Sequence, residues 1–177
     1  MREARGERRG YFFRRKPRAS PSAIAFLSMY PDTSNSAAEP VDLSRVVGEM
    51  DTELRCLLGP KIHFTTGSLP ANGAALVRAD HHELVDLLRH LALDAHDAMP
   101  AGGTVTIRTG RLREVAECAA MLIHEVPDAP VSEERIRKGR SLGLGASFDT
   151  IERAGGHFHV SCRGRETVLT ICFPLAE

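Results

Sequence analysis

Three side chains near the middle of the chain have the spacing of a ligand-binding helix face. His90, Asp94 and Asp97 lie three or four residues apart, so on a helix they share one surface. Carboxylate oxygens are ligands that hard cations such as Mg²⁺ accept readily. The same side chains would be ordinary on a helix face exposed to water. Their spacing therefore predicts a polar helix face and leaves its ligand open.

A glycine-rich turn, Gly143-Leu144-Gly145, is a second candidate because it opens a predicted helix. Backbone N–H groups in the first turn of a helix point at any anion placed there. We expect this helix to run from Leu144 to Ala154 and to end at Gly155-Gly156. Basic residues precede it that could contact phosphate groups or belong to an ordinary solvated loop: Arg135, Arg137, Lys138 and Arg140.

A long helix that carries the polar face is predicted to begin after Asp80. Glu83 follows Asp80 by three residues, which is the capping-box arrangement, and Gly102-Gly103 lies beyond the end of the helix. An earlier amphipathic helix is predicted over residues 43–58. The apolar stripe of the long helix is formed by Leu84, Leu87, Leu88, Leu91 and Ala95.

Short segments that alternate apolar and polar residues predict β-strands. The order of helices and strands fits helices grouped on one face of a mixed, mostly antiparallel sheet. We therefore predict a two-layer α/β sandwich of the α+β class over residues 41–177. The expected strands cover residues 61–66, 74–79, 104–111, 117–125, 157–162 and 167–173, with a charged loop over residues 127–139.

The first 40 residues differ in composition from the rest of the chain. Residues 1–18 hold eight Arg or Lys against two Glu, a charge of +6 in a chain whose net charge is zero. This basic, Ser/Pro-rich tail is predicted to be disordered. Such a basic run could touch nucleic acid or anionic lipid, but it is more often a solvated terminus, and we do not expect nucleic acid to be the main partner. No segment is apolar for long enough to span a membrane or to act as an export signal, so we expect a cytoplasmic protein.

The four cysteines are scattered through the predicted domain. None forms a Cys-x-x-Cys pair, and no His/Cys cluster has zinc spacing. Isolated cysteines with apolar neighbours are usually buried thiols in a reducing compartment. We therefore expect buried free thiols at Cys56, Cys118, Cys162 and Cys172.

Three stretches, in chain order, match the motifs of one known domain. Residues 83–107, ELVDLLRHLALDAHDAMPAGGTVTI, match the pattern LxxxLxNLxxNAxDAMPxGGxxxI. Residues 139–145 match a second glycine box, which ends a lid and starts a helix, and residues 154–174 match a closing hairpin, SGGHIxVxS…TxFxIxLP. Together they resemble the histidine-kinase ATPase domain of the GHKL superfamily, which has the Bergerat fold. The resemblance covers about residues 40–177 and implies binding of ATP and Mg²⁺.

The resemblance assigns roles to the polar helix face, although the chain departs from the family there. The family helix has two asparagines, the second of which binds the metal, and these positions hold His90 and Asp94. Asp94 is therefore the candidate metal ligand, with His90 and Asp97 beside it in the nucleotide site. Without metal, a carboxylate at this position would repel the phosphates. The Gly143-Leu144-Gly145 turn is kept and would bind them.

The adenine amino group is bound in this family by the aspartate of a DxGxG motif. The resemblance places Glu125 at this aspartate and puts Pro127 and Ala129 at the glycines. Proline has no N–H and a fixed φ, and alanine disfavours positive φ, so the loop cannot follow the usual path without strain. Asp128 is the alternative carboxylate. Thr167, at the threonine of the closing hairpin, belongs to the implied nucleotide site.

The resemblance implies a function in two-component-type signalling. No predicted helix before the domain carries a phosphoacceptor histidine, so we expect no autophosphorylation by the usual route. The altered residues favour a degenerate pseudokinase with weak or absent ATP binding, which contacts a response regulator or a sensor kinase in a phosphorelay. The kept glycine turn favours an active domain that phosphorylates a partner in trans, as serine-kinase anti-sigma factors of the superfamily do. A structural remnant of a truncated sensor is a third interpretation.

Overall fold

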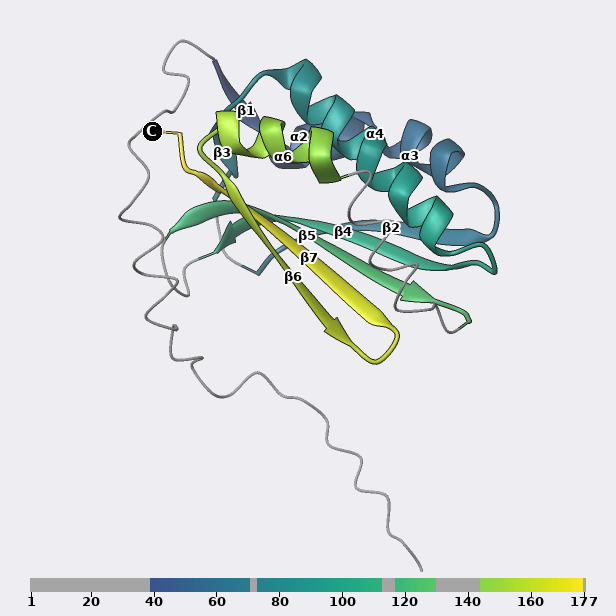
Figure 1. Ribbon diagram of the computed structural model, residues 1–177. Coiled ribbons are helices and arrows are strands. Elements are labelled where there is room, and N and C mark those ends of the chain that lie inside the picture. Colours follow the sequence, from purple (N-terminus) through teal and green to yellow (C-terminus); the bar gives the residue numbers. More distant parts are fainter. Residues whose placement is uncertain (1–38, 71–72, 113–116, 130–143, 177) are drawn as a thin grey trace, which may run out of the picture.

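The protein folds into a layer of helices on a layer of strands (Figure 1). The computed structural model describes residues 39–70, 73–112, 117–129 and 144–176. Its helices are α2 (Leu43–Glu49), α3 (Asp51–Leu58), α4 (His81–Ala98) and α6 (Leu144–Arg153). Its strands are β1 (Pro40–Asp42), β2 (Ile62–Ser68), β3 (Leu76–Arg78), β4 (Gly103–Leu112), β5 (Cys118–Pro127), β6 (His157–Arg163) and β7 (Glu166–Pro174).

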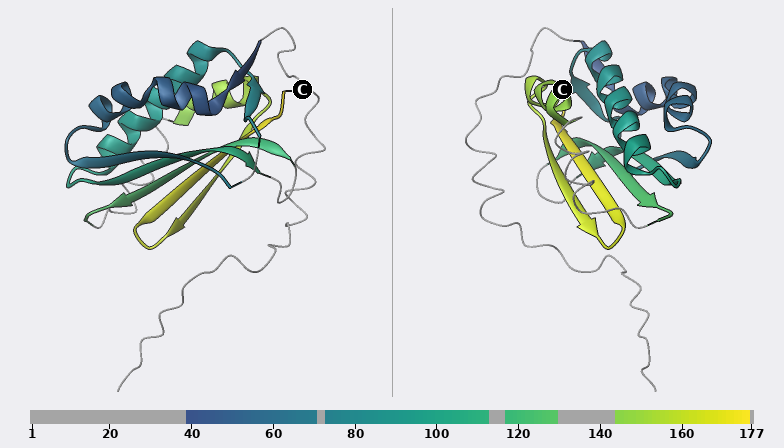
Figure 2. Two further views of the ribbon diagram at one scale, coloured as in Figure 1. Left: turned by 180° about the vertical axis from the view of Figure 1, so that it is seen from behind. Right: turned by 45° about the vertical axis from the view of Figure 1, so that its right-hand side comes forward.

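Five of the strands form one mixed sheet in the order β2-β4-β5-β7-β6. β2 pairs with β4 in parallel, and each of the other neighbouring pairs in this sheet is antiparallel. The described helices all lie on one face of the sheet, as Figures 1 and 2 show from three directions. No described helix or strand covers the opposite face. This arrangement confirms the predicted α+β two-layer sandwich.

The core lies between the two layers because strand side chains alternate between the faces of the sheet. On the helix side, α4 contributes the apolar stripe that its sequence predicts. On the sheet side, β5 and β7 point their odd-numbered residues at the helices: Ala119, Met121, Ile123, Leu169, Ile171 and Phe173. Even-numbered residues of these two strands therefore lie on the uncovered face.

The helix expected over residues 43–58 is in fact two helices that meet at Met50. Met50 has φ −86° and ψ −4°, which ends the regular turn, although its N–H still bonds to the Val46 carbonyl oxygen at 3.1 Å. The apolar stripe stays in phase across the break, since Val46, Met50 and Leu54 are all buried. The sequence periodicity therefore contains no sign of the interruption.

A separate two-stranded sheet of β1 and β3 lies at one end of the helix layer. The sequence does not predict β1, and the strand expected over residues 74–79 is the shorter β3, which pairs with β1 instead of joining the main sheet. The C-terminal segment reaches the same corner, where the Ala176 N–H donates to the Leu76 carbonyl oxygen at 2.9 Å. The first and last described segments of the chain are therefore neighbours.

Two strands, β5 and β2, end two residues later than expected. β5 runs to Pro127, so Pro127 is the last residue of a strand rather than the start of a loop. β2 extends to Ser68. Most of the loop expected over residues 127–139, and residues 1–38 of the expected tail, lie outside the described residues. Among the helices that the structure describes, none is long and apolar enough to cross a membrane.

Candidate functional site

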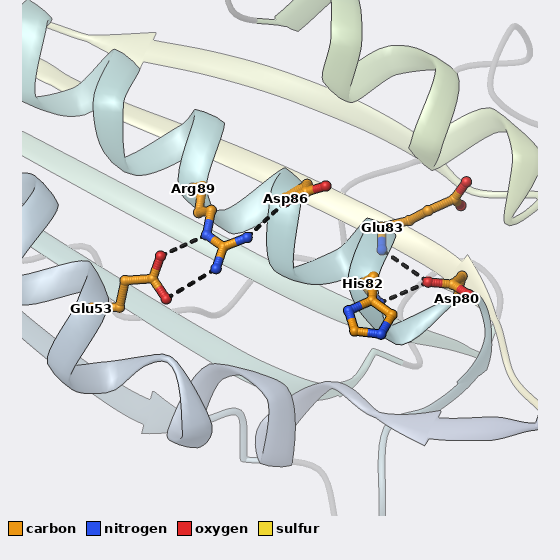
Figure 3. A network of polar contacts seen from close by, with 6 residues as sticks. All are labelled: Glu53, Asp80, His82, Glu83, Asp86 and Arg89. Carbon is orange, nitrogen blue, oxygen red and sulfur yellow. Dashed lines mark hydrogen bonds and ion pairs between the residues drawn. The ribbon is translucent and has the colours of Figure 1, made fainter.

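The helix that carries the predicted ligand face begins at a capped N-terminus (Figure 3). Asp80 lies just before α4, and its carboxylate accepts hydrogen bonds from the N–H groups of His82 at 2.7 Å and Glu83 at 3.2 Å. A cap of this kind satisfies donors that have no partner within the helix. The first half of the predicted capping box is therefore present. The Glu83 side chain has a different partner, on α6.

One flank of α4 is held by α3. Arg89 donates through Nε and Nη2 to the carboxylate oxygens of Glu53 at 2.6 and 3.3 Å, and through Nη1 to Asp86 at 2.8 Å (Figure 3). About two turns later on the same side, His96 Nδ1 lies 2.9 Å from the Leu58 carbonyl oxygen. The side of α4 that carries Arg89 and His96 therefore faces α3.

The opposite flank of α4 faces α6. Glu83 forms an ion pair of 2.9 Å with Arg153 of α6. His90 and Asp97 follow Glu83 at intervals of seven residues, which is nearly two full turns, so they line the same flank. Asp94 lies one turn beyond His90. The structure thus brings His90, Asp94 and Asp97 together on the flank of α4 that points toward α6.

Asp94 is the half-buried member of this group. Its burial raises the pKa of its carboxyl group above the usual value, His90 opposes this rise, and the charge of Asp97 adds to it. His90 and Asp97 are exposed. A shift dominated by burial indicates that the ionised Asp94 loses hydration without gaining a matching cation from the described residues. A cation bound beside Asp94 would offset this loss of hydration.

The N-terminus of α6 lies close to this group because α6 runs antiparallel to α4 (Figure 1). Its last residue, Arg153, contacts Glu83 near the start of α4, and its ten residues run back toward the middle of α4. At a rise of about 1.5 Å per residue in both helices, Leu144 lies beside the turn that carries His90 and Asp94. The start of α6 and the polar flank of α4 therefore face the same space.

Of the glycine turn, the described residues include Leu144 and Gly145. Leu144 and Gly145 are the first residues of α6, which confirms the predicted start of this helix. Backbone N–H groups in a first helical turn have no partner within the helix and can bind an anion. Gly143 and the basic residues between 135 and 140 lie outside the described residues. Their expected contacts with phosphate stay predictions.

Two further predicted residues meet on the sheet. Glu125 on β5 lies directly opposite Thr167 on β7. Both belong to the odd-numbered row that faces the helices, and their neighbours in that row, Ile123 and Leu169, are core residues. On the other side Glu125 is paired with Val105 of β4. Glu125 and Thr167 therefore form a polar end to an otherwise apolar row under the helix layer.

This polar end lies near the C-terminal end of α4. The chain leaves α4 through a tight turn and enters β4 at Gly103, which pairs with Pro127 at the end of β5. Gly102 has a φ of 99°, and a Cβ there would lie 2.6 Å from the Lys61 carbonyl oxygen. Only glycine fits this conformation without strain. The turn therefore fixes where α4 meets the end of β5.

Asp128, the alternative carboxylate, lies elsewhere. Its N–H donates to the Gly102 carbonyl oxygen at 3.0 Å, and its own carbonyl oxygen accepts from Arg165 Nη1 at 2.9 Å. It is exposed in the turn after β5. Glu125 is therefore the carboxylate on the helix-facing side of the sheet.

The side chains around Asp94 could hold a metal ion only together with a bound nucleotide. Within the described residues, no group of three or more His, Cys, Asp or Glu side chains could hold a metal ion. A metal at Asp94 would need its other ligands from water and from a bound nucleotide. Mg²⁺ is commonly held in this way, by one or two carboxylates and substrate phosphates. The residues present fit Mg²⁺ with nucleotide but not Mg²⁺ alone.

A similar arrangement of helices and strands occurs in solved structures of histidine kinases. The mycobacterial sensor histidine kinase MprB superposes with a TM-score of 0.60 and 20 % identity, over 78 % of this chain and 97 % of that chain. The histidine kinase AdeS of Acinetobacter baumannii superposes with a TM-score of 0.59 and 16 % identity, over 88 % and 77 %. The fold is that of a histidine-kinase ATPase domain.

One curated protein is similar in sequence. Sensor kinase CckA of Brucella abortus is 25 % identical over 164 residues, covering 77 % of this chain and 17 % of that protein. This chain therefore spans about a sixth of the length of the curated relative it matches. No family model matches the sequence.

Arg153 is the residue of this domain that sequence reasoning missed. The seven-residue spacing of Glu83, His90 and Asp97 is visible in the sequence and indicates one flank of a helix. Nothing in the sequence shows which element packs against that flank. The contact between α4 and α6 therefore becomes apparent only from the fold.

Proposed function

We propose that residues 41–177 form a degenerate histidine-kinase ATPase domain that acts in two-component-type signalling by binding a partner protein, with weak or absent ATP binding. The observation that carries the proposal is the environment of Asp94. In the family that the sequence resembles, a neutral asparagine stands at this position. Here it is a half-buried carboxylate whose pKa is raised by burial.

The charge on this flank of α4 opposes phosphate binding. Glu83 is matched by Arg153, but no ion pair to Asp94 or Asp97 is found among the described residues. A like-charge pair at 4 Å is unfavourable by about 1 kcal/mol in water and about 4 kcal/mol near a protein surface. Since 1.4 kcal/mol is a factor of ten in affinity, these carboxylates would weaken nucleotide binding by roughly fivefold or more.

The adenine side of the site is altered as well. β5 remains a strand through Pro127, which lies in register with Gly103 of β4. Pro127 offers no N–H, so the backbone at this position cannot donate a hydrogen bond to a base. Glu125 is one methylene longer than the aspartate of the family motif. These changes support a site that holds adenine poorly.

The alternative is an active domain that phosphorylates a partner protein in trans. Two observations favour it: Glu125 and Thr167 meet on the helix-facing row, and α6 begins beside the turn of α4 that carries Asp94. In this case Mg²⁺ would balance the charge of Asp94. Under both hypotheses the partner belongs to a signalling class, a response regulator or a sensor kinase.

Titration of the purified protein with ATP and Mg²⁺, by calorimetry and by thermal shift, separates the two hypotheses. A ligand at a thousandfold excess over its dissociation constant stabilises the folded state by about 4 kcal/mol. The degenerate domain, in which ATP binding is weak or absent, is expected to show at most a small heat and a small thermal shift at millimolar ATP. A stabilisation of about 4 kcal/mol would refute the degenerate domain and support the active one.

The substitution Asp94→Asn tests the observation that carries the proposal. It removes the charge and supplies an amide oxygen, so we expect ATP with Mg²⁺ to bind roughly fivefold or more tightly than in the unaltered protein. Asp86→Asn is the matched control, because it makes the same change on the same helix but on the side where Asp86 contacts Arg89. An equal gain from Asp86→Asn would show that Asp94 has no special role.

A further inference from the structure

The uncovered face of the sheet carries two cysteines on neighbouring strands. Cys118 opens β5 and pairs with Pro174, and Cys172 on β7 pairs with Ala120. The two cysteines are therefore diagonal neighbours across an antiparallel pair. Both have even numbers on strands whose odd-numbered residues face the helices, so their side chains point away from the helix layer.

These thiols contact each other and are only partly buried. The Cys118 and Cys172 side chains share a hydrogen bond. Cys118 and Cys172 are partly buried, and Cys56 is exposed. The three cysteines are free thiols as expected, but the expected burial is wrong for Cys56 and only partial at Cys118 and Cys172. The side chain of Cys162 is not among those that the structure describes.

The two sulfur atoms differ in their surroundings. The hydrogen bond from Cys172 lowers the pKa of Cys118, and the backbone of Leu112 adds to this effect. The same hydrogen bond, together with burial, raises the pKa of Cys172. His157 is the register partner of Cys172 on β6, and burial lowers its pKa. Cys118 is therefore the thiol that ionises first, while Cys172 keeps its proton.

We propose that Cys118 and Cys172 form a redox-active dithiol that hydrogen peroxide converts into a disulfide between β5 and β7. The Cys118 thiolate attacks one peroxide oxygen, the O–O bond breaks, and hydroxide leaves, which gives a sulfenic acid on Cys118. The sulfur of Cys172 then attacks the sulfur of Cys118, the S–O bond breaks, and the hydroxyl leaves with the Cys172 proton as water. The two thiols are oxidised by two electrons and the peroxide is reduced to water.

The strand geometry makes this disulfide easy to reduce again. Diagonal neighbours across an antiparallel pair lie about 7–8 Å apart. Ordinary disulfides join Cα atoms that are at most about 6.8 Å apart. Closing the bond therefore requires the ends of β5 and β7 to shift slightly, and a strained, accessible disulfide is the readily reduced kind. Cys118 lies at the opposite end of β5 from Glu125, so the dithiol does not depend on the nucleotide site.

Peptide mapping of the peroxide-treated full chain tests the proposal. After the remaining thiols are alkylated, we expect a peptide pair joined by Cys118 and Cys172, lighter by two hydrogen atoms and separated by dithiothreitol. Cys56→Ser should leave this product unchanged, because Cys56 lies on α3. Cys172→Ser should abolish it and leave Cys118 as a sulfenic or sulfinic acid. Two results would overturn the proposal. One is oxidation of Cys56 while Cys118 and Cys172 remain thiols and are alkylated, and the other is a disulfide between two chains.

A second probe does not require the strands to move. Phenylarsine oxide bridges two thiols that are close together, so the reduced chain should bind one equivalent. Cys118→Ser and Cys172→Ser should each bind none, whereas Cys56→Ser should bind as the unaltered chain does. An unaltered chain that fails to bind the arsenical would refute the contact between the two thiols.

Discussion

The Glu83 carboxylate lies 2.9 Å from the Arg153 guanidinium, and this contact joins the first turn of α4 to the last turn of α6. The side chains of Arg153 and Glu83 are 57 % and 37 % exposed, so water screens the pair. Exposed pairs of this kind contribute about 0.2–1 kcal/mol. A double-mutant cycle of Glu83→Gln and Arg153→Gln, followed by urea unfolding, should give a coupling free energy in that range. Zero coupling would show that the contact does not stabilise the packing of α4 on α6.

Asp80→Ala is expected to lower the free energy of unfolding by about 1 kcal/mol. The substitution removes the acceptor for the N–H groups of His82 and Glu83, and the loss of an N-cap typically has this size. Asp80→Asn keeps an acceptor and should be close to neutral. Urea unfolding of the three proteins provides the comparison. A loss of equal size with asparagine would argue against the capping role.

Gly102→Ala and Gly48→Ala should change stability in opposite directions. At Gly102, φ is 99° and a Cβ would lie 2.6 Å from the Lys61 carbonyl oxygen, so alanine should destabilise the fold by about 2 kcal/mol or more. At Gly48, within α2, a Cβ would meet nothing within 4 Å, so alanine should stabilise by about 0.5–1 kcal/mol. Thermal and urea unfolding measure both, and a stabilising Gly102→Ala would contradict the turn described here.

The pH dependence of stability should report on Asp94. Burial raises its pKa above the ordinary 3.8, so the folded protein binds this proton more tightly than the unfolded chain. Its contribution to stability is fully present below the ordinary pKa and is lost as the pH rises through the raised pKa of the folded state. Asp94→Asn should therefore stabilise the protein at about pH 7 and lose this advantage near about pH 3. Urea unfolding at both pH values measures it. An equal gain in stability from Asp94→Asn at both pH values would rule out the charge of Asp94 as its cause.

Much of the fold can be predicted from local patterns. The glycine turn predicts the start of α6 at Leu144, and the alternation of residues predicts the strands of the main sheet. β1 cannot be predicted in this way, because three residues contain no periodicity and the strand exists only through its pairing with β3. The interruption at Met50 is also invisible, since the buried positions keep their helical phase across it.

The candidate site, like the fold, can be predicted from the sequence only in part. The shared face of His90, Asp94 and Asp97 follows from helix periodicity alone. The meeting of Glu125 with Thr167 and the contact of Cys118 with Cys172 depend on the register of β5 against β7. Register and helix neighbours are set by tertiary packing, which the residue types along a single segment do not encode. Sequence reasoning therefore finds which residues are polar and where they lie on an element, and the fold supplies their partners.

The corner where β1 meets β3 has a mechanical consequence. The described chain enters at Pro40 through β1 and leaves at Ala176, whose N–H is bonded to Leu76 of β3. A pulling force applied between these two points would act first on this short ribbon, one hydrogen bond after another. The five-stranded sheet takes the load only after this ribbon opens, because β7 ends at Pro174, just before Ala176. Tension along the chain should therefore open the ribbon before it separates the helix layer from its sheet.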